Sequence, residues 1–264
     1  MQGGSARQVL LDNLVLELVR TPEGQLSSPS EQRWQLASRE LSYFRSDAIP
    51  LLIELLVGFA DRRPRDPIAV DRLQTTLSQL DASEEIDRKL THAGLSPQAC
   101  LFLIQCVVKA GDPADIPRLK GWLERSNDWK IRSECVRGLA VHAESDSACR
   151  ELLVAAMRDS DRFVRAQAAA GLQSCVEDDA VVEQFCVALS SSEREIRNMA
   201  VRVLARSRTR SSRLALINAY QLALSCNDRS WLGLLHEALQ FNFAVEKTVG
   251  DLQGWAALLD EVDS

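Results

Sequence analysis

The sequence predicts an all-α fold made of stacked helical hairpins, and three observations support this fold class. Apolar residues recur at spacings of three and four residues along nearly the whole chain of 264 residues, which is the period of an α-helix. Segments of strand length with alternating polarity are missing from the sequence. A short motif also recurs at intervals of 33 and 32 residues, and repeats of this length usually stack into arrays.

The recurring motif begins with an acidic residue and ends with a leucine. Its copies start at Asp128, Asp161 and Glu193, and in each copy an aliphatic residue and an arginine occupy the fourth and fifth positions. Three units therefore agree in register. The aliphatic, arginine and leucine positions of the successive copies are Ile131, Arg132 and Leu139; Val164, Arg165 and Leu172; and Ile196, Arg197 and Leu204.

Stacking of successive units explains most of this motif. The aliphatic residue and the leucine eight residues later share one helix face, and we expect them in the core. The acidic residues can cap helix N-termini, where negative charge is favoured. The arginines lie beside the core stripe, and we expect each to pair with an acid of its own or a neighbouring unit.

Helix boundaries follow from capping residues and from breaks in the periodic pattern. Ser96 and Pro97 suit the N-cap and first turn of a helix that Gly111 ends. Segments 21–30 and 62–67, rich in Pro, Ser, Gly or charge, are expected to be loops. The helices then form six hairpins: 47–60 with 69–80, 83–92 with 96–110, 115–125 with 128–142, 147–158 with 161–175, 179–189 with 192–206, and 212–224 with 228–240.

Both ends of the chain are expected to be helical. The first 20 residues predict an amphipathic helix rather than a signal peptide, because they lack a charge-free apolar core and a cleavage-like site. Segment 248–262 places Leu252, Trp255 and Leu259 on one stripe with acids opposite. We expect this helix to cover the apolar end of the array. The alternative is an acidic helix that binds a partner, such as the basic region of a second copy.

The predicted domain organisation is a single α-solenoid over residues 1–264. Segment 1–111 contains divergent helical hairpins, and segment 112–206 contains three clear repeats. Segment 207–264 contains a degenerate repeat and the terminal capping helix.

The pattern acid-x-x-[Ile/Val]-Arg-x-x-small-apolar-x-x-Leu resembles the HEAT repeats, specifically the short form seen in phycobilisome-lyase-like proteins. The resemblance covers residues 112–206 well and extends less closely to residue 240, where Trp231 and Leu232 replace the aliphatic-arginine pair. It implies an armadillo-like, right-handed α-α superhelix. In this repeat class the second helix of each hairpin lines the inner, concave side.

Composition restricts the classes of partner and compartment. The formal net charge of −6 argues against general coating of nucleic acid, although the segment from Arg194 to Arg213 holds seven arginines and one acid. No apolar run is long enough to span a bilayer. The seven cysteines are odd in number and form no Cys-x-x-Cys pair, so we expect reduced core residues in a cytoplasmic protein.

No catalytic constellation is found in the sequence. His92, His142 and His236 are scattered and have no acid or cysteine at ligand spacing. A dinucleotide fingerprint, a phosphate loop and a nucleophile elbow are missing as well. We therefore expect a protein without enzymatic activity, metal or cofactor.

A protein-binding scaffold or adaptor is the function that the predicted architecture favours. Residues beside the core stripe on the second helices combine arginines with apolar side chains, as interfaces do. We expect a protein partner on the concave face, with its identity and the oligomeric state open. The candidate partner-binding residues are Arg137, Phe163, Asn198, Met199, Arg202 and Arg206.

Three alternative functions remain open. The first is a lyase-like or accessory role, resembling the phycobilisome-lyase branch, in which the solenoid holds a modified client. Nucleic-acid binding through the segment from Arg194 to Arg213 is less favoured. Trp122, Trp129 and Trp231, with Asp128, also invite comparison with HEAT-like alkylpurine DNA glycosylases, which they resemble in fold and which use tryptophans and an aspartate in a concave cleft.

Overall fold

The structure is a computed structural model that describes residues 3–19, 28–62, 66–91, 94–244 and 252–262. In these segments the chain forms fifteen α-helices and two short 3-10 helices and has no strand. The all-α prediction is confirmed. The chain divides into two compact units, residues 1–138 and 139–264, and each is described by itself.

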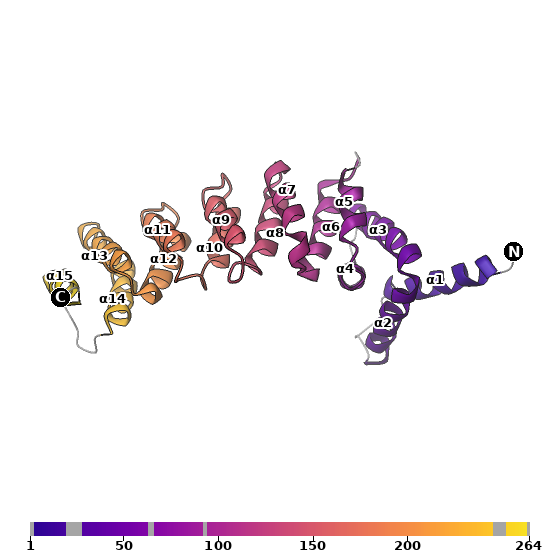
Figure 1. The fold of residues 1–264 in the computed structure, drawn as a ribbon, viewed down its shortest axis with the longest axis horizontal. Helices are drawn as coiled ribbons and strands as arrows, with labels where there is room; N and C mark the ends of the chain where they lie inside the picture. Colours follow the sequence, from indigo (N-terminus) through magenta and orange to yellow (C-terminus); the bar gives the residue numbers. More distant parts are fainter. Residues whose placement is uncertain (1–2, 20–27, 63–65, 92–93, 245–251, 263–264) are drawn as a thin grey trace. The chain divides into compact units, whose positions relative to one another are not determined.

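The first unit contains the two 3-10 helices and most of eight α-helices (Figure 1). The α-helices are α1 (Gly3–Val19), α2 (Ser28–Leu41), α3 (Arg45–Asp61), α4 (Pro67–Gln79), α5 (Ser83–Thr91), α6 (Pro97–Ala110), α7 (Ile116–Arg125) and α8 (Trp129–Ala140). The 3-10 helices are η1 (Ser42–Phe44) and η2 (Pro113–Asp115).

The second unit contains three helical hairpins and a terminal helix. Within it, α9, α11 and α13 form one layer and α10, α12 and α14 form the other (Figure 1). We call these the first-helix layer and the second-helix layer. The helices are α9 (Ser147–Ala156), α10 (Arg162–Gly171), α11 (Asp179–Ala188), α12 (Arg194–Ser207), α13 (Arg210–Ser225), α14 (Arg229–Phe243) and α15 (Leu252–Val262).

The six predicted hairpins correspond to α3–α4 through α13–α14, with boundaries that differ by a few residues at each end. Ser96 caps α6 through its hydroxyl, and Gly111 ends that helix at a φ of 66°. The expected break at 21–30 is shorter than predicted, because α2 already begins at Ser28. The α1–α2 pair was not among the predicted hairpins, although its two helices pack together.

The repeat motif marks the core of the second-helix layer. Val164, Leu172, Ile196 and Leu204 are all buried, which confirms the face predicted from the motif. Trp231 takes the aliphatic position in the fourth unit and is also buried. The larger indole therefore fills the place of a β-branched residue without changing the face that packs inward.

Two repeats have glycine at the same position, directly before the motif leucine, and neighbouring side chains approach this glycine closely. A Cβ added at Gly171 would lie 2.6 Å from the Cβ of Ala140, and one at Gly138 would lie 2.9 Å from side-chain atoms of Leu119 and Val108. The third repeat has Val203 at this position, and this valine is buried. The glycines thus stand where a side chain has no room.

The two ends of the chain differ in how they cover apolar surface. Helix α1 buries Leu11, Val15 and Leu18 but exposes Val9 and Leu16, so the expected amphipathic pattern is weak there.

At the other end, Trp255 of α15 is fully buried, with ring centroids 5.6 Å from His236 and 5.9 Å from Phe243. This burial agrees with the capping role expected for the last helix. The first part of its predicted segment, residues 248–251, lies outside the described residues.

Gly171→Ala should lower the free energy of unfolding by about 1–3 kcal/mol, because the new methyl group overlaps a backbone-anchored methyl group of Ala140. The matched control is Gly233→Ala in the middle of α14, where an added Cβ meets nothing within 4 Å. This second change should raise stability by about 0.5–1 kcal/mol, because alanine loses less backbone entropy in a helix. Urea unfolding of both variants checks the pair. Equal effects of the two changes would contradict the close-packing argument.

Candidate functional site

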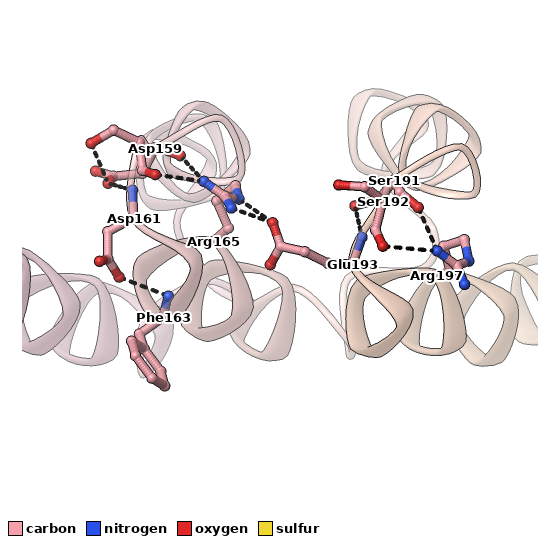
Figure 2. A network of polar contacts seen from close by, with 9 residues as sticks. Asp159, Asp161, Phe163, Arg165, Ser191, Ser192, Glu193 and Arg197 are labelled. Carbon is pink, nitrogen blue, oxygen red and sulfur yellow. Dashed lines mark hydrogen bonds and ion pairs between the residues drawn. The ribbon is translucent and has the colours of Figure 1, made fainter.

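Arginines of the repeat motif hold the turn that leads into the second helix of each hairpin. Arg165 Nη1 donates to the carbonyl oxygens of Asp159 (2.5 Å) and Ser160 (2.9 Å), as Figure 2 shows. Arg197 donates in the same way to Ser191 (2.8 Å) and Ser192 (3.1 Å). These carbonyls lie six and five residues before the arginine in both cases.

The first copy of the motif makes the same contact inside the first unit. Arg132 Nη1 donates to the carbonyl oxygens of Ser126 (3.3 Å) and Asn127 (3.0 Å). All three copies thus use one guanidinium to satisfy two turn carbonyls that the helices leave unpaired. We call this contact the turn bracket. The motif alone predicted an acid as the partner of these arginines and gave no indication of these backbone contacts.

Two of the arginines also reach the next repeat. Arg165 pairs with Glu193 through two guanidinium nitrogens, with 2.9 Å between Nε and Oε1 (Figure 2). Arg197 lies over the Trp231 ring at 5.3 Å from its centroid. The expectation that a motif arginine pairs with an acid of a neighbouring unit is confirmed for Arg165.

The expected capping role holds for two of the three motif acids. Asp128 accepts from the amide of Lys130 (2.9 Å) and Asp161 from that of Phe163 (2.8 Å). Glu193 stands at the N-cap of α12 but makes no side-chain cap hydrogen bond. Its longer side chain extends to Arg165 instead, so the capping prediction is wrong for this residue.

A second arginine bridges repeats in the first-helix layer. Arg150 donates through Nη1 to the Ala143 carbonyl (2.8 Å) and through Nε to Asp178 Oδ2 (2.7 Å). Partial burial acts to raise the pKa of Asp178, but the hydrogen bond and charge of Arg150 and the amides of Ala180 and Val181 outweigh it. The pKa of Asp178 is therefore lowered from its ordinary value.

The predicted partner-binding residues fall on both units. Phe163 on α10 and four residues of α12 belong to the second-helix layer of the second unit, where α10 packs against α12. Arg137 belongs to α8 in the first unit and forms an ion pair with Glu134. The four residues of α12 are Asn198, Met199, Arg202 and Arg206.

The exposed side of α10 and α12 combines apolar and cationic groups. The Phe163 side chain is 46% exposed, and the guanidinium of Arg162 lies 4.6 Å from its ring centroid. Figure 2 shows Phe163 pointing away from the turn bracket. Met199 is half-buried and Arg202 is exposed. We call Phe163, Asn198, Met199, Arg202 and Arg206 the binding face.

Two residues that sequence analysis did not select adjoin the binding face. Phe241 on α14 is 56% exposed, and Arg208 lies 5.7 Å from its ring centroid. Arg208 ends α12 in the left-handed conformation, at a φ of 50°. A sequence signal existed, because Arg208 belongs to the arginine-rich segment. Its contact with Phe241 depends on α12 packing against α14.

The two described histidines lie in packed surroundings. No group of three or more His, Cys, Asp or Glu side chains in the described segments could hold a metal ion. His142 is buried and His236 packs on Tyr220 and Trp255, while His92 lies outside the described residues.

Two tryptophans of the glycosylase-like alternative are buried rather than open for stacking on a base, whereas Trp129 is 36% exposed. The Trp122 indole is buried and donates to Asp87 (3.0 Å), and Asp128 is engaged in capping α8. Trp231 is buried beneath Arg197 in the other unit.

The cysteines are free, as sequence analysis expected, although their exposure varies. Burial raises the pKa of Cys135 to about 12 and that of Cys149 to about 11. Such thiols carry little thiolate and are poor nucleophiles. Cys226 is exposed.

Comparison with known proteins identifies the repeat. The family model described as HEAT repeats matches residues 116–205, from α7 into α12. Residues 116–205 therefore form HEAT repeats, and the resemblance based on the motif is confirmed for this part of the chain. No curated protein sequence matches the chain, and no described helix is long and apolar enough to cross a membrane.

Several solved structures are similar to this chain at low identity. The Escherichia coli protein YibA is 14% identical, with 100% of this chain and 97% of that chain covered and a TM-score of 0.47. The CpcE–CpcF complex of phycocyanin lyase from Nostoc sp. PCC7120 is 16% identical, with coverage of 92% and 97% and a TM-score of 0.36. A designed armadillo repeat protein is 18% identical, with coverage of 96% and 100% and a TM-score of 0.32. Likenesses at this level carry no argument about function.

Arg165→Ala should lower the free energy of unfolding by about 2 kcal/mol, because it leaves two turn carbonyls and Glu193 without their cationic donor. Arg165→Lys should restore little, since one ammonium lacks the planar fork that reaches all three acceptors. The control is Arg162→Ala on the same helix, with an expected loss below about 1 kcal/mol because its guanidinium stacks on exposed Phe163. Urea unfolding gives the free energy of unfolding of all three variants. If Arg162→Ala loses as much stability as Arg165→Ala, the stabilising role of the turn bracket is refuted.

Asp178→Asn should reduce stability at neutral pH and should matter less in acid. Because the folded-state pKa of Asp178 is lowered, its carboxylate contributes stability above its ordinary pKa of 3.8, and this contribution disappears as pH falls through the folded pKa. Urea unfolding at several pH values should show the wild type and the variant converging below about pH 4. The control is Asp179→Asn at the neighbouring exposed position. If its stability difference from the wild type depends on pH as strongly as that of Asp178→Asn, the pairing with Arg150 is not the cause.

Proposed function

We propose that this chain is a non-enzymatic adaptor that binds a protein partner across the binding face of α10 and α12. The observation that supports the proposal is the composition of this face, where an exposed aromatic ring, a methionine and arginines lie together. Aromatic residues, Met and Arg are the types enriched at protein interfaces. Each belongs to an α-helix, so little backbone entropy is lost when a partner binds.

The structural work of the repeat is separate from this face. The turn bracket fixes the entry to each second helix, and the Arg165–Glu193 pair and the buried motif residues hold one hairpin to the next. Figure 2 shows Phe163 pointing away from the turn bracket. Substitutions on the binding face can therefore change recognition with little effect on stacking. This separation makes the proposal open to a direct test.

Affinity purification with the tagged full-length chain tests the adaptor proposal. The wild type should recover one protein in near-equimolar amount from the cells that produce it. Phe163→Asp combined with Met199→Gln should raise the dissociation constant of the purified pair at least about tenfold, because both changes remove apolar contact area from the interface. Isothermal titration measures the constant, and circular dichroism verifies that the variant is folded.

The matched control is Val187→Asp on α11. Val187 is 60% exposed, and it lies in the first-helix layer rather than on the binding face. This change should leave the affinity unaltered. Loss of affinity with Val187→Asp but not with the binding-face variant would place the interface on the other layer and refute the proposal.

A further inference from the structure

Three exposed arginines gather where α12 ends. Arg202 and Arg206 are four residues apart on one side of α12, and side chains at this spacing are neighbours. Arg206 Nη1 donates to the carbonyl oxygen of Gln173 at the end of α10 (3.4 Å). Arg208 turns the other way, over Phe241 of α14. The three cations therefore span the ends of three adjacent helices, and we call them, with Phe241, the arginine cluster.

The surroundings of the arginine cluster differ from those of Arg150 and Arg165, two arginines of the same unit that hold repeats together. Arg150 and Arg165 are partly buried, and each pairs with a carboxylate. Among the described residues, none of the three cluster arginines forms an ion pair with an acid of this chain. Like charges at this spacing repel one another. A carboxylate-bearing ligand would remove that repulsion and gain charge-assisted hydrogen bonds.

The backbone of Arg208 lies in the left-handed region, as does that of Ala244, which ends α14. A non-glycine residue in the left-handed region carries a steric cost that glycine avoids, and glycine is the usual residue at this helix end. The chain has arginine at this position, with φ 50° and ψ 17°. The guanidinium of Arg208 lies 5.7 Å from the centroid of the exposed Phe241 ring.

Apolar groups beside the cations define the partner further. Phe241 is more than half exposed, and Met199 lies one helical turn before Arg202 on α12. A ligand that satisfies both kinds of group needs carboxylates interspersed with apolar side chains. Glutamate and aspartate match the guanidinium fork, and leucine or phenylalanine can contact Phe241 and Met199.

We propose that the arginine cluster binds an acidic protein segment in which carboxylates alternate with apolar side chains. This inference rests on the proposed adaptor function and names the chemistry of its partner. Nucleic acid is the less favoured ligand, because the chain as a whole carries a net charge of −6 and would repel a long polyanion beyond the cluster. A short peptide needs to contact only the cluster itself.

The experiment uses a fluorescein-labelled peptide of about 15 residues, with glutamates interspersed among leucine and phenylalanine. A peptide of this length can contact the ends of several helices at once. A second peptide carries glutamine in place of glutamate, and a single-stranded oligonucleotide represents nucleic acid. Fluorescence anisotropy with the full-length chain should show binding of the glutamate peptide only. Arg202→Glu combined with Arg206→Glu should weaken this binding at least about tenfold. Added salt should weaken it as well, since exposed charges are screened.

Two further variants separate recognition from folding. Arg229→Glu reverses one exposed charge at the opposite end of α14, outside the cluster, and should leave binding unchanged. Arg208→Gly removes the cation while relieving the left-handed backbone, so it should weaken peptide binding without lowering the melting temperature. A purely structural Arg208 would give the reverse, with a lower melting temperature and intact binding.

Four results would overturn the proposal: no binding of the glutamate peptide, equal binding of the glutamine peptide, tighter binding of the oligonucleotide, or equal loss with Arg229→Glu. These results leave the adaptor function itself testable. If affinity purification still recovers a partner whose binding depends on Phe163 and Met199, the adaptor function is supported and only the proposed acidic character of the partner is rejected. If no partner is recovered while the peptide binds as expected, peptide binding by the arginine cluster is supported and the adaptor function is rejected.

Discussion

The repeat array depends on how the polar backbone of its turns is satisfied. Each hairpin must reverse direction, and this leaves carbonyl groups near the start of the second helix without helical partners. A single arginine in the motif donates to two of these carbonyls in three successive repeats. At Arg165 and Arg197 the same side chain also contacts the next repeat, so one residue links the turn, its helix and the following hairpin.

The arginines of the second unit fall into two groups, set by helix position. Arg165 and Arg197 are partly buried and direct their guanidinium groups to the turns and to the next repeat. Arg202, Arg206 and Arg208 remain exposed. They lie near apolar side chains, a combination typical of protein interfaces.

Much of the fold could be predicted from the sequence, because stacked repeats depend on local patterns. The register of Ile131, Val164 and Ile196 identified the buried face, and the capping residue Ser96 and the terminator Gly111 identified the ends of a helix. The candidate site was predicted less completely. Exposed Phe163 and the arginines of α12 were found by helical geometry, whereas the Arg208–Phe241 pair involves residues on different helices and has no local signal.

The sequence by itself determined the helical class, the repeat length and the side of each helix that faces the core, because these follow from periodicity and capping within a few turns of chain. Only the tertiary structure decided what each arginine contacts. Glu193 could cap its own helix or reach the preceding repeat, and the choice depends on the position of Arg165, 28 residues earlier. Distances between repeats are set by packing, including the close approach at Gly171. A motif repeated along the chain does not encode them.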